Sequence, residues 1–172
     1  EDVRMDIWAP DSAQIEVLSA FAAIDSTDGM EVRLGSLAAK SHRRVVLRIT
    51  TGEGKPGGTL DFGVEVSGRE IATGDEIPSE EATASLAFAR GRENSGQSRV
   101  DEIAVIVANE WQGHAIRKAI ELNRSGDYRK ASEYLLAQLR YFNRYCSGLA
   151  EGTQLISDFE LAARRMGRPV EE

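Results

Sequence analysis

The sequence contains few of the residues that build metal, redox and disulfide sites. Its 172 residues include one cysteine, Cys146, and two histidines, His42 and His114. A lone cysteine excludes an intramolecular disulfide, and two separated histidines without a second cysteine do not predict a zinc site. The cysteine usage is compatible with a reducing, cytoplasmic compartment, and it leaves secretion open.

Long apolar runs and an excess of positive charge are also missing. No apolar run approaches the roughly 18 residues that indicate a membrane-spanning helix. The 28 acidic residues outnumber the 21 Lys and Arg, which gives a net charge of −7. Nucleic-acid binders need a concentrated positive field that displaces counterions from phosphates. We therefore expect neither membrane insertion by this segment nor nucleic-acid binding.

No catalytic motif is recognisable. The glycine-rich stretch 52–58 lacks the Gly-Lys-Ser/Thr of a phosphate-binding loop, and no Gly-x-Ser-x-Gly elbow occurs. The segment 25–29 resembles the start of a calcium loop without its later acidic positions, so a turn is the better interpretation. Glu80 and Glu81 are interpreted as part of a solvated loop. The sequence predicts no enzymatic activity, no cofactor and no metal site in this chain.

The first ninety residues alternate between apolar and polar side chains with a period of two. Turn signals rich in Gly, Pro, Asp and Ser separate the alternating stretches. Short strands at this spacing are typical of an antiparallel sandwich, so residues 1–92 are predicted to form an immunoglobulin-like β-sandwich. The predicted strands lie near residues 3–7, 15–21, 30–34, 45–49, 60–66 and 84–88.

Beyond a polar hinge at 91–96, the apolar period becomes helical. Apolar stripes predict helices over about 99–124 and 128–146, and a third stripe ends at Gly167. Residues 99–168 are therefore predicted to form a helical hairpin or a bundle of about three helices. The predicted fold class is α+β, with the β-sandwich first and the helices second.

Four residues of the helical half are candidates for a protein-interaction surface: Trp111, Tyr141, Arg144 and Tyr145. Trp111 could anchor an interface, although burial in a helix–sheet core is favoured. The aromatic and arginine residues near 141–145 could also stack on nucleic acid. Helical spacing points Phe142 inward and leaves Tyr141 and Arg144 on the outer flank, which favours the end of an amphipathic helix.

The densest basic cluster is the stretch KSHRR at 40–44. It lies between two alternating apolar stretches, so a polar strand connection is the better interpretation than a phosphate-binding patch. Arg43 and Arg44 are expected to begin the next strand, with Val45, Leu47 and Ile49 facing the core and Val46 facing outward.

Two stretches resemble a known family. Residues 32–49, VRLGSLAAKSHRRVVLRI, are similar to the LGDLxxGExRxVLLxL segment of the β-sandwich that follows the von Willebrand factor A domain in many bacterial proteins. Residues 119–131, AIELNRSGDYRKA, resemble the A-x-x-L-x-x-x-G-D-x-x-x-A helical hairpin found after that sandwich. Sandwich, hinge and hairpin come in the same order, so the resemblance covers most of the chain.

The resemblance implies that an A domain carrying Mg²⁺ or Ca²⁺ lies upstream, because its Asp-x-Ser-x-Ser motif does not occur in these residues. The chain begins directly in a strand-like alternation, so we expect it to be the tail of a larger protein. The expected function is a non-catalytic accessory module that binds a protein partner or its own upstream A domain, with a homo-oligomer also possible. The alternative is a β-sandwich that binds a small ligand or an extracellular surface through the loops near 25–29 and 52–58.

Overall fold

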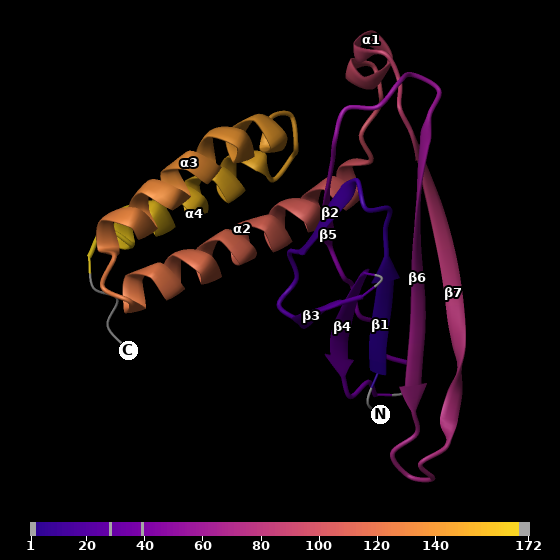
Figure 1. Ribbon diagram of the computed structural model, residues 1–172. Coiled ribbons are helices and arrows are strands. Elements are labelled where there is room, and N and C mark those ends of the chain that lie inside the picture. The colour runs from indigo at the N-terminus through magenta and orange to yellow at the C-terminus, as the bar shows by residue number, and fades with distance from the viewer. Residues whose placement is uncertain (1–2, 28, 39, 169–172) are drawn as a thin grey trace. The chain divides into compact units, whose positions relative to one another are not determined.

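The computed structural model describes residues 3–27, 29–38 and 40–168, which fall into two compact units (Figure 1). The β unit contains the chain up to Val17 and Phe21–Gln97. The helical unit contains Leu18–Ala20 and the chain from Ser98 onward.

The β unit contains two antiparallel sheets. The larger has the strand order β3-β4-β1-β6-β7, and the smaller pairs β2 with β5. The larger sheet is formed by β1 (Val3–Trp8), β3 (Ala22–Ser26), β4 (Gly29–Gly35), β6 (Thr59–Arg69) and β7 (Glu76–Ala87). The smaller consists of β2 (Ala13–Val17) and β5 (Leu47–Thr51).

The core of the β unit lies between these sheets. Val3, Ile7, Val32 and Leu34 are buried on one face of the larger sheet, and side chains of the smaller sheet, including Ile15, pack against them. Alternation in each strand sends the intervening polar residues to the opposite face. The predicted N-terminal antiparallel β region followed by helices is confirmed. Its strands divide five and two, whereas an immunoglobulin constant domain divides them four and three.

Several local expectations in the β unit were wrong. Strand β3 was not predicted and contains Asp25 and Ser26, so the turn expected at 25–29 is confined to the connection between Ser26 and Gly29, which pair with each other. Glu80 and Glu81 lie in strand β7 and not in a loop. Strand β5 begins at Leu47, and Val46 is buried with 9% of its surface exposed, because strand alternation has not yet begun at that residue.

The helical unit contains three long helices: α2 (Asp101–Arg124), α3 (Tyr128–Cys146) and α4 (Gly152–Arg165). The predicted number and approximate bounds of the long helices are confirmed. A short helix, α1 (Gly91–Ser95), occupies the segment expected to be only a polar hinge. Gly126 ends the α2–α3 turn with φ +87°, a backbone conformation that residues with a Cβ rarely adopt.

Small and large side chains interlock in the helical core. Helix α2 buries Ala104, Ala108, Ala115 and Ala119 on one stripe. Helices α3 and α4 supply larger side chains, including Phe142 and Phe159, which are fully buried. Their rings meet edge to face, with centroids 5.5 Å apart for Trp111–Phe142 and 4.8 Å apart for Phe142–Phe159. No described helix is long and apolar enough to cross a membrane.

Replacing Phe142 with alanine should destabilise the helical unit by about 3–5 kcal/mol, because it removes a fully buried ring and leaves a cavity. The neighbouring substitution Tyr141→Ala should cost little, since 63% of Tyr141 is exposed. Urea unfolding followed by helical circular dichroism measures both. Equal losses for the two variants would contradict this packing.

Candidate functional site

Helices α2 and α3 bring Trp111 and Tyr145 into contact. The two rings meet nearly perpendicular, at 74°, with centroids 5.7 Å apart. The indole Nε1–H of Trp111 donates a hydrogen bond to Oε1 of Gln138 at 3.0 Å. Trp111 is half-buried against the core that the three long helices form. The expected burial in a helix–sheet core is thus corrected, because the packing partners of Trp111 lie on the helices.

Arg99 joins this aromatic cluster at the C-terminal end of α3. Its guanidinium lies 5.5 Å from the centroid of the Tyr145 ring. It also donates hydrogen bonds to the backbone oxygens of Tyr145 and Ser147. A cation at this place compensates the partial negative charge of the last carbonyls of the helix. Sequence reasoning missed Arg99, since it lies 46 residues before Tyr145 and no local pattern connects them.

Tyr141 and Arg144 lie on the exposed side of the same helix. Tyr141 is 63% exposed, and Arg144 and Ala137 are also exposed. One turn later, Tyr145 is half-buried against Trp111. The structure therefore divides the four predicted surface residues into a packed pair, Trp111 and Tyr145, and an exposed pair, Tyr141 and Arg144. We call the exposed pair with Ala137 the α3 flank.

Burial changes the acid–base chemistry beside this cluster. Burial raises the pKa of the Tyr145 phenol, and the Arg99 guanidinium partly opposes that rise. Burial likewise raises the pKa of the Cys146 thiol, again with Arg99 acting in the opposite direction. Nucleophilic cysteines have lowered pKa values and exposed sulfur atoms. Cys146 is 1% exposed, so its environment is that of a core residue.

A second surface, which sequence reasoning did not identify, is the outer face of the larger sheet. Register places four carboxylates in one row across four strands: Glu31, Asp6, Glu65 and Glu81. Like charges directly opposite each other in a sheet are destabilising. The sequence shows that these carboxylates occupy outward-facing positions of their strands, but only the strand pairing shows that they lie next to each other.

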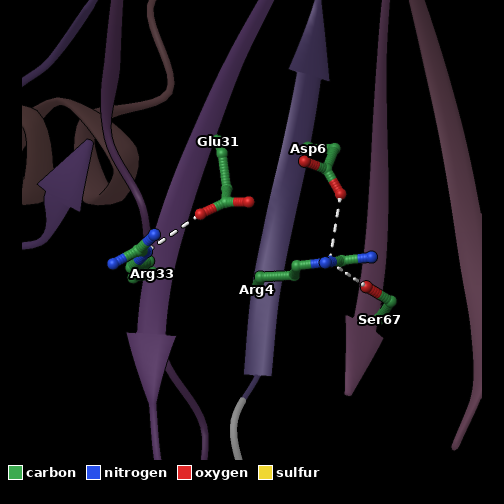
Figure 2. Close-up of polar contacts among 5 residues, drawn as sticks. All are labelled: Arg4, Asp6, Glu31, Arg33 and Ser67. Atoms are coloured by element: carbon green, nitrogen blue, oxygen red, sulfur yellow. Dashed lines mark hydrogen bonds and ion pairs between the residues drawn. The ribbon is translucent and has the colours of Figure 1, made fainter. Parts of the chain in front are cut away.

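Two arginines of the neighbouring row offset part of this repulsion (Figure 2). Nε of Arg33 lies 2.9 Å from Oε1 of Glu31, and Nε of Arg4 lies 3.6 Å from Oδ2 of Asp6. Arg4 also donates a hydrogen bond to Oγ of Ser67 at 3.0 Å. Each ion pair lies within one strand, β4 or β1, and the hydrogen bond to Ser67 connects β1 with β6.

The basic stretch 40–44 lies in the connection between β4 and β5. Lys40 adopts a positive φ of 62°, and the Ser41 hydroxyl donates to the Ala38 carbonyl at 2.6 Å. Arg43 and Arg44 are exposed before β5 begins, so the expectation that they start the strand was wrong. As expected, the exposed residues 40–44 belong to a polar connection between strands.

Among the residues that the structure describes, no three or more His, Cys, Asp or Glu gather closely enough to hold a metal ion. The two loops that were predicted to bind a ligand, 25–29 and 52–58, do not line the same depression. Asp25, Thr27 and Gly29 border a surface depression together with Trp8 and Gln14. The stretch 52–58 does not line it; there Gly54 lies so close to Phe88 that a Cβ would meet the ring.

No family model, curated protein or solved structure matches this chain.

Removing Arg33 should destabilise the β unit by up to about 1 kcal/mol at low salt, because Glu31 would face Asp6 without its cation. Adding Asp6→Asn to Arg33→Ala should recover most of the loss. Urea unfolding at low and high salt measures this. An Arg33→Ala effect that neither salt nor the second substitution changes would refute the electrostatic explanation.

The raised pKa values predict a loss of stability in alkali. The folded chain holds the Cys146 and Tyr145 protons more firmly than the unfolded chain, whose ordinary values are 9.0 and 10.0. Their contribution is complete below those values and disappears as the pH rises through the raised ones. From about pH 8 to about pH 11, melting temperatures of the double variant Tyr145→Phe, Cys146→Ala should fall less than those of the unaltered protein. Parallel curves would contradict the assignment.

Proposed function

We propose that this chain is a non-catalytic accessory module that binds another protein through the α3 flank. The observation that carries the proposal is an exposed tyrosine–arginine pair on a helix whose other face packs into the helical core. Tyr141 is 63% exposed, whereas the adjacent Phe142 is fully buried and packs against Trp111 and Phe159. Tyrosine and arginine are enriched among residues that dominate binding energy in protein interfaces.

The packing beneath the α3 flank supports this proposal. Trp111 and Tyr145 hold the helix from one side, and Arg99 binds its last carbonyls. Because the backbone is already ordered, binding would cost little further conformational entropy. The chemistry of the flank fits a partner with an apolar patch for the Tyr141 ring and a carboxylate for the Arg144 guanidinium.

The resemblance to the region after bacterial von Willebrand factor A domains suggests one such partner. The two resembling segments, 32–49 and 119–131, lie in a β unit and in a helical hairpin, in the order that the resemblance implies. If the full protein carries an upstream A domain, that domain is the first partner to test, and any Mg²⁺ or Ca²⁺ would belong to it.

The alternative is a ligand-binding β-sandwich. The depression bordered by Trp8, Asp25 and Gly29 favours it, because an exposed tryptophan ring beside polar groups suits a small ligand. It has fewer supports than the α3 flank, since 52–58, the other predicted loop, lies outside it.

The test compares two matched pairs on one helix. Tyr141→Ala with Arg144→Ala removes the α3 flank, and Tyr128→Ala with Arg129→Ala removes another exposed Tyr–Arg pair at the opposite end of α3. With a purified partner protein, the first variant should bind about tenfold or more weakly. The second variant should bind as the unaltered protein does.

Calorimetric titration measures the affinities, and circular dichroism checks that both variants fold. Equal binding by both variants would overturn the proposal. Loss of binding on Trp8→Ala, with the α3 variants unaffected, would move the site to the depression in the β unit.

A further inference from the structure

The last strand of the larger sheet, β7, has an open edge. It is 12 residues long, stands at the end of the strand order, and every one of its residues is exposed. Among the described residues no strand lies beyond it (Figure 1). An edge strand of this kind presents a row of backbone N–H and C=O groups without strand partners.

The hydrogen bonds beyond the end of β7 show which residues face that open edge. The Phe88 N–H donates to the Gly58 carbonyl, and the Phe88 carbonyl accepts from the Gly57 N–H, both at 2.8 Å. Phe88 thus directs its backbone groups toward the β6 side. The register runs without interruption from Ala87 to Glu80, so Leu86, Ala84 and Ala82 do the same. The groups directed to the open edge belong to the alternate residues Ala87, Ser85, Thr83 and Glu81.

Features that discourage strand addition are confined to one end of β7. Pro78 lies beside the register shift between Val66 and Gly68, and Glu80 and Glu81 follow it. Proline, charge and bulges are the usual protections of a sheet edge. The remaining residues, 82–87, are uncharged and contain no proline or glycine. Five of these six are Ala, Ser or Thr, whose short uncharged side chains point to the two faces of the sheet and leave the backbone of the edge accessible.

We propose that β7 pairs antiparallel with β7 of a second copy of this chain, joining two larger sheets into one. A twofold axis perpendicular to the sheet keeps each face on its own side, so partners must be an even number of residues apart. With the axis at Ala84, Thr83 faces Ser85 of the second copy and Glu81 faces Ala87. Both pairs lie among the residues whose backbone groups point to the open edge, so the hydrogen-bonding pattern is satisfied as well.

The charges of β7 exclude the registers centred on its glutamates, allow this one, and are compatible with a second copy as the occupant. An axis at Glu80 or Glu81 would place a carboxylate against its own symmetry mate, which is unfavourable. The Ala84 register instead pairs each Glu81 with an uncharged Ala87 and lets Thr83 and Ser85 form favourable cross-strand contacts. The same segment therefore complements itself without any like-charge pair. This inference is independent of the α3 flank, which lies in the other unit.

The first test is the oligomeric state of the folded chain. Sedimentation velocity over a range of concentrations should show a monomer–dimer equilibrium. Thr83→Pro removes an N–H directed to the open edge and leaves the β6–β7 hydrogen bonds in place, so it should yield a monomer with an unchanged circular dichroism spectrum. Ile24→Lys alters the opposite edge strand, β3, and should leave the dimer intact. A monomer at every concentration, or a dimer that Ile24→Lys disrupts, would overturn the proposal.

The second test fixes the register and does not depend on Thr83→Pro folding. Ala84→Cys would place two thiols across the twofold axis in a non-hydrogen-bonded pair, where Cα atoms lie about 4.5 Å apart and a disulfide can form. Ala82→Cys, on the same face, would hold its two thiols four residues out of register. Mild oxidation should cross-link the first variant and not the second, because Cys146 is buried in both. Cross-linking through position 82 alone, or through neither, would overturn the pairing.

Discussion

The edge-to-face packing of Phe142 is the interaction on which the helical unit depends. Its ring touches Trp111 of α2 and Phe159 of α4, so one side chain of α3 ties all three long helices together. The alanines of α2 allow this approach because they add little volume at the contact. Since Phe142 must point inward, Tyr141 beside it must point outward. The exposed flank of α3 is thus a geometric consequence of the core.

The β unit follows a different constraint, the two-residue period of its strands. Strands β1, β4 and β6 of the larger sheet send apolar residues to the core and charged residues to the outer face, where pairing with β7 aligns four carboxylates. Arg4 and Arg33 offset that alignment on β1 and β4. On β7, the same row ends at Glu81, next to the uncharged residues 82–87 of the open edge.

The sequence predicted the helices better than the strands, for physical reasons. Helices α2 and α3 carry long apolar stripes, and Gly126 marks the turn between them, so their bounds were predicted within a few residues. Strand β3 was missed because Ala22–Ser26 is exposed throughout and shows no apolar alternation. Val46 was assigned to the wrong face because β5 begins only at Leu47, later than the alternation suggested.

For the candidate site, local periodicity correctly predicted that Phe142 is buried and Tyr141 exposed. The contact of Trp111 with Tyr145 and the role of Arg99 depend on how α2 packs against α3, which no local pattern specifies. The most direct measurement of the central claim is photo-cross-linking from a benzophenone amino acid at position 141 of the folded chain in a cell lysate. The account predicts cross-links from position 141 to another protein or domain, and none from the same probe at position 128. Cross-links from position 128 alone, or from neither, would contradict it.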